Sequence, residues 1–312
     1  MTRQRFRGDA QSPATRITQE IIARLEAGTK PWIKPWRGVP VSRPLRACGT
    51  PYRGMNVFWL WMVADMCGYA SPYWMTYNQA KTFGAQVRKG EKSTIAIFYK
   101  SYTKEVEAPD TGEKSDEARR VLKAYPVFNA DQVEGLPERF HPAASLELVE
   151  PEGRETALDT FFAAIPVNLR HQGGEAYYEP TPDRVTMPPA NLFSGFDHYY
   201  ATLAHELSHW TGHPSRLGRN LKNRFGTAAY AAEELVAELS SAMLGAELGL
   251  PVTHLESHAS YVEHWLNLLR DDDRAILTAA AKAEEASSLL LKLGGRAMAD
   301  GADEGDDVAL AA

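Results

Sequence analysis

The chain has 312 residues, a formal net charge of −6 and two cysteines, Cys48 and Cys67. This length suits two compact domains, and two cysteines exclude a disulfide scaffold and a Cys-rich metal site. The N-terminus lacks an apolar signal segment and no stretch approaches the roughly 18 uninterrupted apolar residues of a membrane span, so we expect a cytoplasmic protein with no membrane partner.

The first part of the chain predicts a small α+β domain over residues 13–132. Ile17, Ile21 and Leu25 lie four residues apart and predict an amphipathic helix that starts at Ser12, with Pro13 in its first turn, and stops at Gly28. After a proline-rich loop at 30–54, the pattern predicts helices over 56–66 and 77–83 and strands over 94–99 and 121–128, with an acidic, turn-rich insert at 104–117.

The second part predicts a mainly helical domain over residues 155–293, so the fold class is α+β. Prolines and charges at 133–154 indicate a linker before it. The predicted helices are 155–165, 197–211, 228–248, 256–269 and 271–293, with extended chain at 177–187. Residues 294–312 are small and acidic, which predicts a disordered tail.

An HExxH motif, His205 to His209, lies in the predicted helix 197–211. Histidines four residues apart project from the same face of a helix, so His205 and His209 can ligate one Zn²⁺ ion, or another divalent metal in its place. Glu206 would then be the catalytic general base of a metal-assisted hydrolysis. The motif therefore predicts a zinc hydrolase of the metallopeptidase type.

The third metal ligand is less directly indicated. The longer motif with a third histidine fails because Ser215 stands at its last position, and His213 has no metal-ligand spacing. A glutamate from the next predicted helix is the alternative, and we favour Glu234 over Glu233 and Glu238. Glu238, one turn further on, would orient a ligating histidine. This arrangement is the gluzincin type of metallopeptidase site.

The substrate-binding strand and the oxyanion-stabilising residue of such a site have candidates in the sequence but no single assignment. Peptidases of this kind commonly bind substrate along an edge strand, and residues 183–187 are the candidate strand. Tyr177, Tyr178, Tyr230 and His213 are all candidates for stabilising the oxyanion, and the pattern does not choose among them.

Net positive charge and tryptophans are concentrated in the first third of the chain. Residues 1–100 hold 16 Lys and Arg against 5 Asp and Glu, and five of the seven tryptophans. Exposed aromatics interleaved with cations favour single-stranded nucleic acid, whose bases stack and whose phosphates bind the cations. Trp59 and Trp61, in an apolar helix, are predicted core. The predicted DNA-binding residues are Trp32, Lys34, Trp36, Arg53, Trp74, Arg88, Lys89 and Lys92.

Several of these segments together resemble a known family. Residues 52–56, 74–77 and 84–92 resemble the single-stranded-DNA-binding domain of ArdC-type antirestriction proteins, and 205–213 with 233–238 look like the zincin-like metallopeptidase domain that follows it. The resemblance implies a plasmid-borne or other mobile-element protein that binds single-stranded DNA during conjugation and protects it from host restriction.

Two functions remain open on this basis. In the first, the protein is an antirestriction factor, acting either as a DNA shield or by cleaving a host restriction subunit. In the second, it is a regulatory metallopeptidase that cleaves a repressor or another host protein when it senses single-stranded DNA. A primase-associated module is the weaker reading, since the chain shows no carboxylate cluster suited to nucleotide polymerisation.

Overall fold

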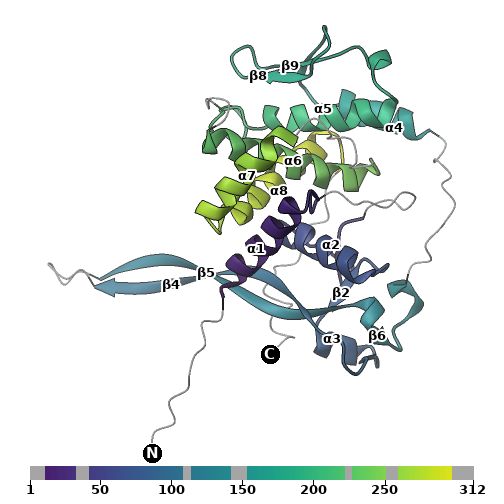
Figure 1. The fold of residues 1–312 in the computed structure, drawn as a ribbon, viewed down its shortest axis with the longest axis vertical. Coiled ribbons are helices and arrows are strands. Elements are labelled where there is room, and N and C mark those ends of the chain that lie inside the picture. The colour runs from purple at the N-terminus through teal and green to yellow at the C-terminus, as the bar shows by residue number, and fades with distance from the viewer. Residues whose placement is uncertain are drawn as a thin grey trace, which may run out of the picture.

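The computed structural model describes residues 11–32, 42–107, 114–141, 153–221, 227–250 and 259–296. Helices and strands are mixed, as the α+β prediction expected, and the two halves of the chain lie one above the other (Figure 1). The helices of the first half are α1 (Pro13–Glu26), α2 (Met55–Cys67) and α3 (Tyr77–Thr82).

Local chemistry accounts for the start of the first helix. Ser12 caps α1 through its side-chain oxygen, which accepts a hydrogen bond from the backbone N–H of Thr15, and Pro13 occupies the first turn. Ile17, Ile21 and Leu25 are buried, so the predicted apolar face of this helix is confirmed.

A four-stranded sheet in the order β1-β2-β5-β4 underlies the first half. Its strands are β1 (Leu45–Arg46), β2 (Tyr73–Met75), β4 (Thr94–Glu107) and β5 (Lys114–Asn129). The last two form a long antiparallel hairpin that projects from the body (Figure 1). The predicted insert 104–117 was therefore wrong in large part, because backbone pairing continues through it as far as Glu107 and Lys114.

The predicted linker 133–154 was wrong at its beginning. Strand β6 (Val133–Glu134) pairs with β3 (Gln86–Val87), and Phe140 is fully buried against Phe83. Residues 133–141 therefore belong to the first half, because an apolar side chain within the proline-rich stretch fills a small core there. The remainder, at 142–152, lies outside the described residues.

The second half consists mainly of helices that lie below a three-stranded sheet in the view of Figure 1, and the strand order of this sheet is β7-β9-β8. Its elements are α4 (Arg154–Ala163), β7 (Asn168–His171), β8 (Tyr177–Glu179), β9 (Arg184–Met187), α5 (Phe196–Trp210), α6 (Ala228–Leu248), α7 (Ala259–Asp271) and α8 (Ala275–Leu293). The five predicted helices are thus present, and most of the predicted tail lies outside the described residues. Across the described ranges, none of the helices is both long and apolar enough to cross a membrane.

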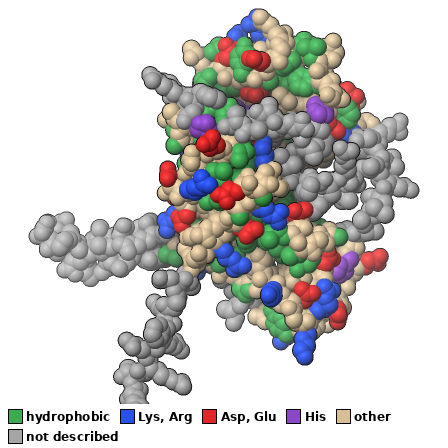
Figure 2. Space-filling model, viewed as in Figure 1, with side chains coloured by type: hydrophobic (Ala, Val, Ile, Leu, Met, Phe, Trp, Pro, Cys, Tyr) green, Lys and Arg blue, Asp and Glu red, His purple; other side chains and the backbone are tan. Residues whose placement is uncertain are grey.

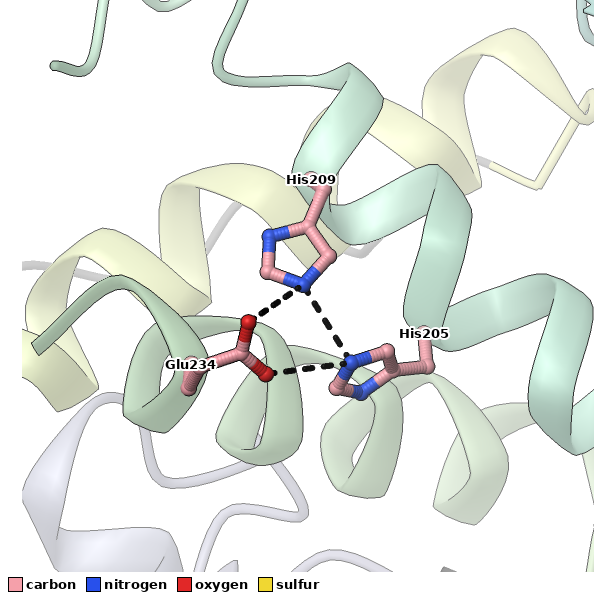
Figure 3. A group of neighbouring side chains, drawn as sticks. All are labelled: His205, His209 and Glu234. Carbon is pink, nitrogen blue, oxygen red and sulfur yellow. Dashed lines mark hydrogen bonds and ion pairs between the residues drawn. The ribbon is translucent and has the colours of Figure 1, made fainter. Parts of the chain in front are cut away.

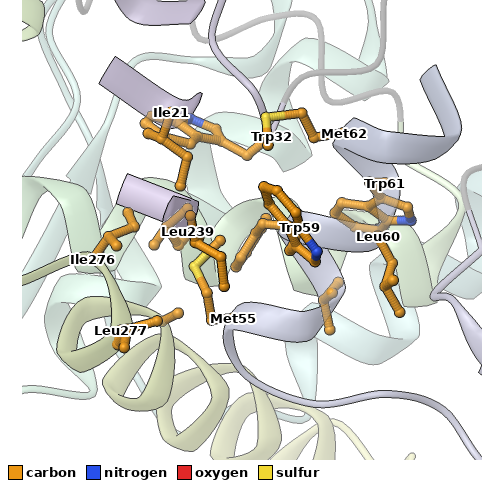
Figure 4. Close-up of a cluster of buried hydrophobic side chains, with 14 of the residues drawn as sticks. Ile21, Trp32, Met55, Trp59, Leu60, Trp61, Met62, Leu239, Ile276 and Leu277 are labelled. Carbon is orange, nitrogen blue, oxygen red and sulfur yellow. The ribbon is translucent and has the colours of Figure 1, made fainter. Parts of the chain in front are cut away.

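One hydrophobic core joins the two halves. Ile21 of α1, Trp59 of α2, Leu239 of α6 and Ile276 of α8 belong to the same buried cluster (Figure 4). A buried ion pair supports this junction: Arg43 donates to Glu284 of α8 at 2.9 Å. Each half also has a hydrophobic core of its own, around Phe140 in the first half and around Leu207 in the second, so the shared cluster adds a third core at the junction of α1 and α2 with α6, α7 and α8.

Candidate metal centre

Helix α5 holds the HExxH motif in place by its opposite face. Leu203, Leu207 and Trp210 are buried in a second hydrophobic core, formed with α4, β9 and the C-terminal end of α6. This packing leaves His205 and His209 facing α6. The helix is therefore anchored by apolar contacts while its polar residues face the neighbouring helix.

Three side chains from two helices converge (Figure 3). The Nε2 atoms of His205 and His209 lie 3.2 Å apart. The carboxylate of Glu234, on α6, places one oxygen 3.7 Å from His205 Nε2 and the other 3.6 Å from His209 Nε2. Two imidazole nitrogens and a carboxylate oxygen therefore meet at one point.

This donor set fits a divalent metal. The three ligand atoms lie within 4.8 Å of one another, and the three side chains are buried or nearly so. Two histidines and one glutamate are also the protein ligands in one known class of catalytic zinc site. His213 does not join them, and its Nδ1 instead lies 2.8 Å from the hydroxyl of Ser215.

The charges of the site favour a cation between the rings. Burial lowers the pKa of His209, but hydrogen bonds to Glu233 and Glu234 outweigh burial and raise that pKa to about 10. Burial would raise the pKa of Glu234, yet hydrogen bonds from His205 and His209 hold it well below its usual range. The carboxylates thus attract a proton or a metal ion, and the two compete for the same position.

Glu233, rather than Glu238, holds the far side of His209. Its Oε1 lies 3.3 Å from His209 Nδ1. Arg219 fixes Glu233 in turn, donating from Nη2 and Nε at 2.9 and 3.0 Å. These contacts, from Arg219 through Glu233 to His209, orient the imidazole ring. The only residue predicted for such a role was Glu238.

Glu238 lies one turn beyond Glu234 on α6 and is 0 % exposed. Its carboxylate accepts a hydrogen bond from Lys30 of the first half and is close enough to His205 for their charges to interact, while its orienting role stays a prediction. Lys30 had no predicted role at this site. Its proximity depends on contacts between the two halves, which sequence spacing does not contain.

Glu206 faces the cavity next to the three ligands. Burial raises the pKa of its carboxyl group, and the positive charges of His205 and His209 partly oppose that effect. The backbone N–H of Tyr178, on β8, donates a hydrogen bond to the carboxylate. A raised pKa and a fixed orientation suit a group that accepts a proton and returns it near neutral pH.

A cavity of about 750 Å³ opens over the motif. Strand β8 borders it, with Tyr177 and Tyr178 among the lining residues. The predicted substrate strand 183–187 was wrong, because β9 lies in the middle of its sheet and is paired on both sides. The edge strand that faces the cavity is β8.

Among the four oxyanion candidates, Tyr230 contacts one of the three candidate ligands directly. It lines the cavity, its hydroxyl lies 3.2 Å from that of Tyr261, and it is hydrogen-bonded to Glu234. Burial, followed by the hydrogen bond with Tyr261, raises its pKa. Tyr230 therefore stays protonated and able to donate a hydrogen bond.

Two of the predicted DNA-binding tryptophans are core residues. Trp32 and Trp74 are each 1 % exposed. Trp32 packs edge to face on Trp265, and Trp74 does so on Tyr69. Neither ring can stack on a base in this conformation, so both assignments were wrong. Aromatic residues near cations do not reveal by themselves which rings fill the core.

The predicted cations that the structure describes all lie at the surface. Arg53, Arg88, Lys89 and Lys92 are exposed, and Arg88 forms an ion pair with Glu91 at 2.8 Å. Figure 2 shows Lys and Arg side chains over this part of the molecule with acidic side chains among them. Lys34 and Trp36 lie outside the described residues.

Tyr77 is an exposed aromatic residue of this region that was not among the predicted DNA-binding residues. Its side chain is 39 % exposed at the first position of α3. The Lys81 ammonium lies 4.8 Å from its ring centre, and Gln86 donates to its hydroxyl at 3.0 Å. The Thr76 capping box fixes this helix start, and such a cap followed by an aromatic residue was a signal available in the sequence.

Two family models match the chain. Residues 11–128 match the N-terminal domain of anti-restriction factor ArdC, and residues 156–282 match a zincin-like metallopeptidase. Among curated proteins, an uncharacterized protein y4eC of Sinorhizobium fredii is 41% identical over 276 residues, which cover 86% of this chain and 88% of that protein. The DNA primase TraC of Escherichia coli is 39% identical over 293 residues, but this chain spans only 26% of it.

Solved structures agree with these matches. A metal-free crystal structure of the antirestriction protein ArdC from plasmid R388 is 44% identical, with a TM-score of 0.78, and covers 91% of this chain and 98% of its own. An Mn(II)-bound crystal structure of the same protein is 42% identical with a TM-score of 0.74 and the same coverage. The similarity therefore extends through both halves.

Proposed function

The chain belongs to the ArdC antirestriction family, and from this premise we propose that it binds single-stranded DNA during conjugative transfer and carries a zinc-dependent peptidase site. The observation that carries the proposal is the convergence of His205, His209 and Glu234 beside Glu206 at the bottom of the cavity. The sites for DNA and metal would then belong to one continuous body.

His205, His209 and Glu234 would hold the ion, zinc or another divalent metal in its place. When bound, the ion polarises a carbonyl group and makes water more acidic. Glu206 takes the proton of the attacking water and passes it to the leaving amine, so one water molecule is added across the peptide bond. The N–H of Tyr178 keeps this carboxylate aimed into the cavity.

Substrate would lie along β8, the edge strand of the cavity. An extended chain can pair with the free edge of a sheet, and Tyr177 and Tyr178 line the cavity at this edge. Tyr230 is the best placed donor for the developing negative charge, because it lines the cavity beside Glu234 and stays protonated.

For DNA, we propose a surface formed by Tyr77 with Arg53, Arg88, Lys89 and Lys92. Tyr77 offers an exposed ring on which a base can stack, and the four cations would bind phosphates. Binding of this kind tolerates different sequences and weakens steeply with added salt.

A conjugation assay into a restricting recipient tests the proposed function. Wild type should protect the incoming plasmid, and a variant with Lys89 and Lys92 both changed to Glu should not. Glu206→Ala separates the two modes of protection. Full protection by that variant would mean a DNA shield, whereas loss would mean that the protein cleaves a host target.

The regulatory alternative makes a different prediction for the same site. A peptidase that senses single-stranded DNA should produce a cleaved host protein only when such DNA is added to the metal-loaded enzyme. Cleavage without DNA, or no cleavage of any host protein, would exclude it. The observation that keeps this alternative open is the contact of Lys30 with Glu238, which joins the first half to the metal centre.

A further inference from the structure

We propose that Lys30, from the first half of the chain, is a positioning residue of the metal centre in the second half. It would act by holding the Glu238 carboxylate in a fixed place beside His205. The inference rests on the metal site of the proposed function, and it makes that site a joint construction of the two halves.

The contact itself is short and shielded from water. Lys30 Nζ lies 3.2 Å from Glu238 Oε1, although the residues are 208 positions apart. The side chain of Glu238 is 0 % exposed and that of Lys30 is 14 % exposed. A buried carboxylate depends strongly on a nearby cation, and breaking one partner of a buried pair is costly.

Aromatic packing fixes the position of the ammonium group. Trp32, two residues beyond Lys30, packs edge to face on Trp265 of α7 at 5.6 Å between ring centres. The ammonium of Lys30 also lies 5.6 Å from the centre of the Trp265 ring. Trp265 in turn donates from Nε1 to the backbone oxygen of Ala231 on α6 at 3.0 Å.

The indole ring of Trp265 therefore ties the Lys30 segment to the helix that carries Glu234 and Glu238. Each of these contacts joins residues of different halves or different helices. They restrict the positions that the Lys30 ammonium group can adopt, so it points at the buried Glu238 carboxylate.

From Glu238, the effect reaches the ligands in one step. The carboxylate interacts electrostatically with His205 and stands one helical turn from Glu234. Groups behind a ligating histidine set its orientation and its affinity for metal. Without the ammonium group, Glu238 would lose the charge that holds it, and the His205 ring would lose a fixed neighbour.

The test is metal affinity, measured with Mn²⁺ by electron paramagnetic resonance and with Zn²⁺ by competition against a chromophoric chelator. Lys30→Met should weaken binding by about 10- to 100-fold. Lys30→Arg, which keeps the positive charge, should recover part of that loss. Circular dichroism of the metal-free variants checks that they are folded.

Arg43→Met is the matched control. Arg43 also forms a buried ion pair between the two halves, with Glu284 at 2.9 Å and Glu247 at 2.7 Å. Its loss should lower thermal stability while metal affinity stays at the wild-type value. Equal weakening of metal binding by Arg43→Met and Lys30→Met would mean that Lys30 has only a structural role, and the proposal would be overturned.

A double-mutant cycle tests the route through Glu238. If Lys30 acts on the metal through this carboxylate, Lys30→Met should have no further effect on affinity in a Glu238→Gln background. Additive losses, or wild-type affinity in Lys30→Met alone, would refute the proposal. Failure of the wild type to bind either metal would instead refute the proposed peptidase function.

Discussion

Glu233 Oε1 lies 3.3 Å from Nδ1 of His209, on the side of the ring opposite to the nitrogen that faces Glu234. Two adjacent glutamates of α6 thus contact the same imidazole at its two nitrogens. One has the position of a metal ligand and the other that of the acceptor which orients the ring. This division explains why the alternatives Glu233 and Glu234 could not be separated by spacing alone.

Glu233→Ala should weaken metal binding by about 10- to 100-fold without abolishing it, because the ring loses its orienting acceptor but all three ligands remain. Isothermal titration with Zn²⁺ measures the change. Glu263→Ala, an exposed glutamate on α7, is the control and should bind metal normally. Complete loss of metal by Glu233→Ala would mean that Glu233 is itself a ligand.

Glu206→Gln should retain the metal and lose peptide hydrolysis. The amide keeps the size of the side chain but cannot take a proton, and losing a general base costs about 100- to 10,000-fold in rate. Metal content by mass spectrometry, alongside cleavage of a peptide library, checks both halves of the prediction. A variant without metal would place Glu206 among the ligands and contradict the proposed role.

Tyr77→Ala should weaken binding of single-stranded DNA by about 5- to 150-fold, the loss of one stacked base at about 1 to 3 kcal/mol. Fluorescence anisotropy with a labelled oligonucleotide measures it. Tyr177→Ala removes a tyrosine that is also exposed but borders the metal cavity, and it should bind DNA normally. Equal losses in the two variants would count against a stacking site at Tyr77.

The Asp183–Arg216 pair should make the free energy of unfolding depend on pH. Hydrogen bonds from Arg216 hold the pKa of Asp183 below its usual range, so the folded protein binds the proton less readily than the unfolded chain does. This contribution is present above the unfolded pKa of about 4 and is lost as the pH falls through the lower, folded value. Urea unfolding at several pH values should show a smaller loss below pH 4 in Asp183→Asn than in wild type, and identical pH profiles would contradict the prediction.

Features that depend on one helix were predictable from the sequence. The spacing of His205 and His209 follows from the helical period, and the bounds of α6 were predicted to the residue. Glu234 needed only a second helix with carboxylates on one face. Such features can be predicted because the spacing of residues along the sequence and the period of the folded helix are the same.

Features that depend on how elements pack were not predictable. The rotation of α6 against α5 decides which glutamate meets His209, and strand order decides that β8 rather than β9 is the edge. The burial of Trp32 depends on Trp265, far away in the chain. None of these relationships leaves a periodic trace in the sequence.

The apolar cluster shared by α1, α2, α6 and α8 means that the two halves of the gene cannot be separated without exposing apolar surface. If the gene were cut between its two parts, each product would expose the surface that the other had covered, including Ile21 on one piece and Ile276 on the other. Neither piece would be a ready-made module for recombination. Selection should therefore keep both parts together on one reading frame whenever the element that carries them moves to a new host.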